Sequence, residues 1–272
     1  MALIATSLTL GCAGQEDSGS AGPSLDSTYA PTSALGPDQR QNKTSVLVYN
    51  GEGAAAADSQ ALIDILADHD LKYNAVSSSE LNAMSLEEIA GYGLILWPGG
   101  YAGTASKSLS VETRIRLNRA VVERGVSYIG FCAGAFIAMN APSVGGKAPE
   151  YGFSLLPYEG ILPEYEPNGI HQHDSPIILT FSLYGGAKRD LVWYGGPLFP
   201  GAREVLARYK TGDPAIIQAA AGKGFVILSA PHPESPAGWT DAQNDSDGVA
   251  GDIELAWRLI EAALNRSPQP TM

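Results

Sequence analysis

The chain has 272 residues, of which 44% are hydrophobic, enough to bury one full core without disulfide or metal staples. Its net charge of −12 and pI near 4.7 argue against a nucleic-acid backbone or an anionic lipid surface as a charge-driven partner. No stretch is long and apolar enough to span a bilayer. Two cysteines, Cys12 and Cys132, are too few for a disulfide framework and too far apart for a metal motif.

The first 43 residues are expected to lie outside the folded domain. Residues 1–12 contain an apolar run that ends in Leu10-Gly11-Cys12 and then turns polar, which resembles a bacterial lipoprotein signal whose cysteine becomes lipid-bearing. Residues 13–43, rich in Gly, Ser, Ala and Pro, lack the large apolar side chains needed to offset ordering entropy, so they predict a disordered tether. Lipidation of Cys12 would make the protein an exported lipoprotein, periplasmic or on the outer surface. The alternative is an apolar N-terminus without an export role, and a cytoplasmic protein.

The first half of the expected domain, residues 44–266, alternates apolar runs with helical patterns. The predicted strands are Ser45–Tyr49, Tyr73–Val76, Leu94–Trp97 and Ser127–Phe131. Between them, one helix buries Leu62, Ile65 and Leu66, and another spans about residues 111–122. Continuous apolar strands separated by helices indicate a parallel sheet that is covered on both faces.

After about residue 150 the pattern changes to closely spaced strands. They are predicted around Ile177–Phe181, Leu191–Tyr194, Glu204–Tyr209, Ala215–Ala219 and Phe225–Ser229. The last two are joined by a hairpin turn at Ala221–Gly224. A final helix is expected with Asp252 as its N-cap and one apolar stripe: Ile253, Trp257, Ile260 and Leu264.

Cys132 stands where a catalytic nucleophile would be expected. The segment Gly130-Phe131-Cys132-Ala133-Gly134 follows an apolar strand and precedes a helical pattern, and small residues on both sides of Cys132 permit a strained turn that projects its side chain. The N-terminus of the following helix would favour thiolate over thiol. The alternative is an inert buried thiol.

His232 and Glu234 are the expected base and its orienting partner. They follow a late apolar strand in the segment Ala230-Pro231-His232-Pro233-Glu234, two residues apart, so that both can point the same way. The backbone N–H groups of Gly99, Gly100 and Ala133 are expected to bind a developing oxyanion. A His-Pro-Glu turn without any role is the alternative.

Together these segments resemble the class I glutamine amidotransferase-like superfamily, and most closely the biotin-protein ligase N-terminal domain family. The resemblance rests on Pro98-Gly99-Gly100, Val46–Gly51, Gly130–Ala135, Trp193–Pro197 and Ser229–Glu234. It implies a flavodoxin-like three-layer αβα sandwich with a mostly parallel central sheet, plus additional β hairpins in the C-terminal half. It also implies that Cys132, His232 and Glu234 form a triad, and that Trp193–Pro197 brings backbone close to the site.

The sequence departs from glutamine-using members in one respect. They usually carry Gln four residues after the nucleophile, where this chain has Phe136, and 272 residues leave no room for an ammonia-accepting or ligase domain. We therefore expect a thiolate hydrolase or amidase with an unknown small-molecule amide or acyl substrate. The alternative is a catalytically silent binding or regulatory module of the same fold.

No cofactor and no metal are predicted, and the sequence does not predict the oligomeric state. The stretch Gly100–Ser108 resembles a phosphate loop, but Ser106 replaces the required glycine. His171, His173 and Asp174 could face a metal ion, although a solvated loop explains them more simply.

Overall fold

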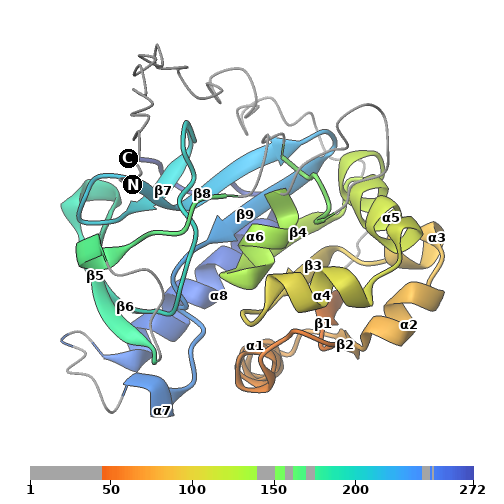
Figure 1. Ribbon diagram of the computed structural model, residues 1–272, viewed down its shortest axis with the longest axis horizontal. Helices are drawn as coiled ribbons and strands as arrows, with labels where there is room; N and C mark the ends of the chain where they lie inside the picture. The colour runs from red at the N-terminus through yellow and green to blue at the C-terminus, as the bar shows by residue number, and fades with distance from the viewer. Residues whose placement is uncertain (1–44, 140–150, 157–161, 170–174, 241–245, 247) are drawn as a thin grey trace, which may run out of the picture.

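The computed structural model describes residues 45–139, 151–156, 162–169, 175–240, 246 and 248–272 (Figure 1). The expected signal, the expected tether and the His171–Asp174 segment lie outside the described residues. Among the described residues, no helix combines the length and apolar character that crossing a bilayer requires.

The described residues form one nine-stranded sheet in the order β2-β1-β3-β4-β9-β8-β7-β5-β6. From β2 to β9 the neighbouring strands are parallel: β2 (Tyr73–Val76), β1 (Val46–Tyr49), β3 (Leu94–Trp97), β4 (Ser127–Phe131) and β9 (Gly224–Ser229). The remaining strands pair antiparallel: β8 (Pro214–Ala221), β7 (Val205–Arg208), β5 (Ile177–Leu183) and β6 (Lys188–Trp193). The predicted fold class is confirmed.

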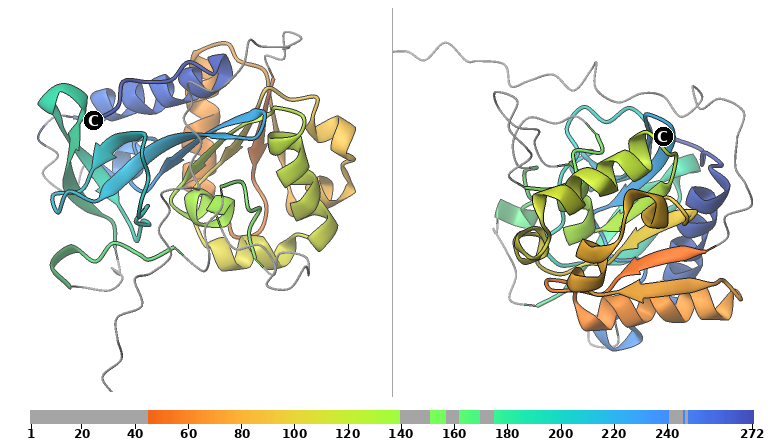
Figure 2. Two further views of the ribbon diagram at one scale, coloured as in Figure 1. Left: turned by 90° about the horizontal axis from the view of Figure 1, so that it is seen from above. Right: turned by 90° about the vertical axis from the view of Figure 1, so that its right-hand side faces the viewer.

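Helices cover both faces of the sheet. They are α1 (Ala56–Asp68), α2 (Ser78–Ala83), α3 (Leu86–Ile89), α4 (Ala102–Ser108), α5 (Val111–Val122), α6 (Ala133–Met139), α7 (Ala237–Thr240) and α8 (Val249–Asn265). Seen from above, α1 (orange) and α8 (dark blue) lie on one face, and α4, α5 and α6 (yellow to green) on the other (Figure 2). The ring of His69, just after α1, stacks on Trp257 of α8 with centroids 3.5 Å apart, which joins the two helices of the first face.

The last helix differs from its prediction. It begins at Val249 with Gly248, whose φ is 86°, as its N-cap, so Asp252 lies in the first turn and is not the N-cap. Its fully buried positions are Asp252, Ala256, Leu259, Ile260, Ala262 and Ala263. Of the predicted stripe only Ile260 is fully buried, because the face that meets the sheet is turned by about one residue, or 100°.

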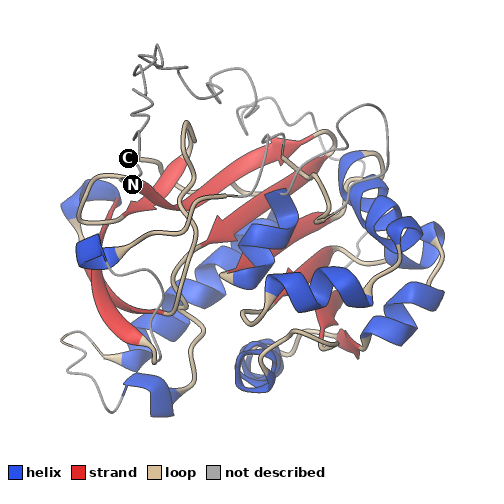
Figure 3. Cartoon of the chain, viewed as in Figure 1, coloured by secondary structure: helices blue, strands red, loops and turns tan. Residues whose placement is uncertain are grey.

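The antiparallel end of the sheet bends back toward the parallel half. Strands β5 and β6 form the curved edge at the left of Figures 1 and 3. Near the end of β6, Val192 forms an isolated antiparallel bridge with His232, which follows β9, and its carbonyl accepts a 2.8 Å hydrogen bond from the His232 N–H. The loop after β6 therefore reaches the carboxyl ends of β4 and β9.

Candidate active site

Cys132 occupies a strained turn at the end of β4. Its φ of 44° lies in the left-handed region, which is uncommon for a residue other than glycine and concentrates at functional sites. A Cβ on Gly130 would lie 2.4 Å from backbone atoms of Gly134, and one on Gly134 would lie 2.7 Å from the carbonyl oxygen of Trp97. The small residues of the motif are thus required because α6 packs directly on the ends of β3 and β4.

His232 and Glu234 form the expected hydrogen-bonded pair. His232 Nδ1 lies 3.0 Å from Glu234 Oε1, and the two residues are 1% and 0% exposed. Because the Nδ1 proton points to Glu234, Nε2 is the nitrogen that remains for proton transfer, and it has no hydrogen-bond partner among the described residues. Cys132 is close enough for its charge to act on the imidazole.

A second carboxylate, Asp58, faces the same imidazole nitrogen and was missed by the sequence analysis. Asp58 lies in the first turn of α1 and is 0% exposed, and its Oδ2 is 3.4 Å from His232 Nδ1. The N-terminus of α1 is tied to the Pro-Gly-Gly turn by a 2.9 Å hydrogen bond from the Ala55 N–H to the Gly99 carbonyl. The sequence offers one signal for Asp58, which is an acidic residue soon after β1. Because β1 neighbours β3 and parallel strands end at the same edge of a sheet, a residue that follows β1 can lie near the turn that follows β3.

The surroundings of His232 favour its cationic form. Burial lowers the pKa of the imidazole, but the negative charges of Glu234, Cys132 and Asp58, in that order, raise it well above 6.5. Burial raises the pKa of the Glu234 carboxyl; the charge of His232 opposes this rise and that of Asp58 adds to it. One buried imidazole thus lies between two buried carboxyl groups.

Gly99 packs against the base itself. A Cβ at Gly99 would lie 2.3 Å from Asp58 Oδ2 and 2.4 Å from His232 Cε1, so the absence of a side chain makes room for both groups. The N–H groups of Gly99, Gly100 and Ala133 donate no hydrogen bond within the part of the chain that the structure describes. Their role in binding an oxyanion stays a prediction.

The loop after β6 closes over the thiol. Cys132 Sγ lies 3.7 Å from the carbonyl oxygen of Tyr194 and 3.8 Å from that of Gly195, so the thiol can donate to either. The ring of Trp239, in α7, lies against both neighbours of the thiol, 5.7 Å from the His232 ring and 6.1 Å from the Tyr194 ring. Cys132 is only 5% exposed in this arrangement.

The comparisons with known proteins agree with the fold and the motifs. Residues 44–143 match the family model described as "Biotin-protein ligase, N terminal". The structure is similar to one described as a crystal structure of glutamine amidotransferase, with a TM-score of 0.50 and 21% identity over 80% of this chain and 98% of that chain. The chain therefore has the fold of glutamine amidotransferase-like proteins.

Two further solved structures give weaker likenesses to this chain. A glutamine amido transferase from Methylobacillus flagellatus has a TM-score of 0.48 and 12% identity, over 86% of this chain and 98% of that chain. A cytoplasmic protein from Salmonella typhimurium LT2 has a TM-score of 0.48 and 12% identity, over 83% of this chain and 100% of that chain. No curated protein sequence matches the chain. The likeness at a TM-score of 0.50 and 21% identity shows the fold alone.

Three buried side chains of the site, Asp58, His232 and Glu234, are also where a metal ion would find ligands. The ligand atoms of Asp58, His232 and Glu234 all lie within 4.8 Å of one another. The 3.0 Å contact between His232 and Glu234 is an ordinary hydrogen-bond length, and a shared proton accounts for the arrangement without an ion. We assign no metal to these residues.

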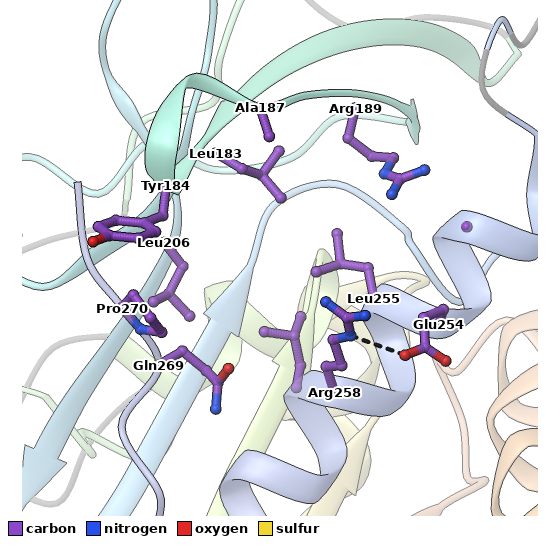
Figure 4. Close-up of a pocket in the computed structure, with 12 residues that line it drawn as sticks. Leu183, Tyr184, Ala187, Arg189, Leu206, Glu254, Leu255, Arg258, Gln269 and Pro270 are labelled. Carbon is purple, nitrogen blue, oxygen red and sulfur yellow. Dashed lines mark hydrogen bonds and ion pairs between the residues drawn. The ribbon is translucent and has the colours of Figure 1, made fainter.

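A cavity of about 410 Å³ lies apart from the triad, between the antiparallel strands, α8 and the C-terminal residues (Figure 4). Leu183, Leu206 and Leu255 line it together with Arg189 and with Arg258, which is ion-paired to Glu254. No residue of the triad lines this cavity. Its mixed apolar and charged walls do not identify a ligand.

Proposed function

We propose that the protein is a cysteine-dependent hydrolase or amidase that acts on an amide or related acyl bond of a small molecule. The observation that carries the proposal is the arrangement of Cys132 in a left-handed turn at the end of β4, beside a buried His232 that is hydrogen-bonded to Glu234. A nucleophile, a base and a group that orients the base are the three parts that covalent acyl transfer needs.

In the proposed reaction the Cys132 thiolate attacks the carbonyl carbon of the substrate. The carbonyl oxygen becomes an oxyanion that accepts hydrogen bonds from the N–H groups of Gly99, Gly100 and Ala133. His232 gives its Nε2 proton to the leaving group, the bond to that group breaks, and a thioester on Cys132 remains. His232 then takes a proton from water, whose oxygen attacks the thioester, and the acid and the thiol are released.

The proposal does not extend to glutamine as the substrate. Phe136 stands where glutamine-using relatives of this fold usually carry Gln, and its side chain is half-buried against the core. The triad and the amides would serve any acyl compound that reaches Cys132, whereas recognition of glutamine would need a group that this position does not provide.

The test compares Cys132 with an ordinary thiol. In a Cys12→Ser background Cys132 is the sole cysteine, so iodoacetamide alkylation reports on it alone. We expect iodoacetamide to alkylate Cys132 at pH 7 at least about tenfold faster than it alkylates a cysteine peptide. The reason is that a site which stabilises the thiolate, the reactive form, increases the thiolate's population. His232→Asn should remove this advantage, and an activated ester should leave an acyl group on Cys132 that mass spectrometry detects.

The rival function is a catalytically silent binding module. The near-complete burial of Cys132 and its contacts with the Tyr194 and Gly195 carbonyls favour this rival. It would be supported if Cys132 reacts no faster than the peptide thiol and His232→Asn changes nothing. The same result would end the hydrolase proposal.

A further inference from the structure

Asp58 is buried against the imidazole of His232. Both of its carboxylate oxygens lack a conventional hydrogen bond among the described residues, and the His232 imidazole lies 3.4 Å away. A fully buried carboxylate without compensating hydrogen bonds is strongly destabilising when it is charged. The sequence nevertheless places an acid there, and Gly99 leaves it the room to reach the imidazole.

The imidazole therefore has more acceptors than its Nδ1 proton can satisfy. Glu234 Oε1 approaches Nδ1 from the same loop at 3.0 Å, and Asp58 Oδ2 approaches it from α1 at 3.4 Å. One N–H can donate well to only one of them at a time. The unused oxygen of Glu234, Oε2, also has no hydrogen-bond partner among the described residues.

We propose that Asp58 is a positioning residue that shares the Nδ1 proton of His232 with Glu234, so that two carboxyl groups from different elements hold the imidazole in its orientation. The proposal rests on the proposed function, in which His232 serves Cys132, and it adds a fourth member to the expected triad. The titratable groups that act on His232 are Glu234 from its own loop, Asp58 from α1 and Cys132 from the strained turn after β4, called the elbow below. Burial raises the pKa of Tyr209, and the charge of Cys132 adds to that rise.

The experiment measures the iodoacetamide alkylation rate of Cys132 between pH 5 and pH 10 in the Cys12→Ser background. The variants are Asp58→Asn, Glu234→Gln and their combination. Asp64→Asn is the matched control, because it removes the same charge from an exposed position of the same helix, where Asp64 accepts a hydrogen bond from Gln60. Thermal unfolding of each variant tests whether it is folded.

We expect Asp58→Asn to move the midpoint of the alkylation profile upward by about 1 pH unit, because it removes a negative charge within 4 Å of the imidazolium and so weakens the thiolate beside it. Glu234→Gln should move the midpoint further, since its contact is shorter. The double variant should exceed the sum of the two shifts, because each single variant leaves one carboxylate on Nδ1. Asp64→Asn should leave the profile unchanged.

The proposal is overturned if Asp58→Asn leaves the midpoint unmoved and the double variant equals Glu234→Gln alone. It is also overturned if EDTA shifts the wild-type profile, because a metal and not a proton would then occupy the three groups. If Asp58→Asn does not fold, Asp58→Ala with and without added formate replaces it: recovery of the wild-type midpoint by formate supports the proposal, and no recovery refutes it. Failure of the proposed function looks different, because His232→Asn would then leave the profile unchanged as well.

Discussion

The elbow around Cys132 makes a steric prediction that does not depend on any substrate. Gly130 lies within β4 and its φ is not in the left-handed region, so alanine there would carry no backbone strain. Its Cβ, however, would lie 2.4 Å from two backbone atoms of Gly134, which no side-chain rotation can relieve. We expect the added methyl group to cost about 3 kcal/mol in the free energy of unfolding, at the upper end of the range for overpacking. Replacing glycine also lowers the conformational entropy of the unfolded chain, which offsets about 0.4–1 kcal/mol of that cost.

The net effect of Gly130→Ala should be a loss of about 2 kcal/mol in the free energy of unfolding, which for a domain of this size lowers Tm by about 4–8 °C. Urea denaturation followed by fluorescence measures it. Gly103→Ala is the control: Gly103 lies in α4 with nothing within 4 Å of an added Cβ, so that variant should gain about 0.5–1 kcal/mol. Equal stabilities of the two variants, or wild-type alkylation of Cys132 in Gly130→Ala, would refute the argument that α6 is seated directly on β4.

Three further predictions follow from the site and the N-terminal sequence. Because its pKa is raised in the folded state, His232 stabilises the fold fully below pH 6.5 and progressively less as the pH rises toward the folded pKa. The free energy of unfolding measured in urea titrations should therefore fall as the pH rises above 6.5. The fall should be smaller in Glu234→Gln, and an equal fall would contradict this reasoning. Trp239→Ala should speed alkylation of Cys132 several-fold, because it removes the ring beside His232 and Tyr194; an unchanged rate would show that Trp239 does not limit access. If Cys12 is lipidated, cells should incorporate labelled palmitate into the wild type and not into Cys12→Ser.

The parallel half of the fold was predictable because its strands carry continuous apolar runs. Leu94–Trp97 and Ser127–Phe131 are entirely buried, and both were predicted with the bounds that the structure gives to β3 and β4. The short helices α2 and α3 were not predicted, since their signal is local. Each begins at a capping box, with Ser77 and Glu80 or Ser85 and Glu88 exchanging hydrogen bonds. Four to six residues are too few for apolar periodicity to show.

The site was predictable where one segment contains both a residue and the reason for it. His232 and Glu234 are two apart after a strand, so their contact follows from local geometry. Asp58 reaches the same imidazole only because β1 lies beside β3 and the N-terminus of α1 bonds to the turn after β3. A strand order that differs from the sequence order leaves no pattern in any one segment of the sequence. The same holds for the bend of the sheet that brings Tyr194 to the thiol.

The same topology explains why the histidine of this site depends on so many parts of the chain. The His232 N–H is held by the Val192 carbonyl of β6, its Nδ1 faces carboxylates from its own loop and from α1, and its Cε1 rests against the backbone of Gly99. The elbow alone could be kept by packing, because small residues there serve the contact between β4 and α6. A buried imidazole between two buried carboxyls contributes nothing comparable to packing, and such groups are costly to bury. Packing can therefore account for the elbow at Cys132 more easily than for the buried polar groups around His232.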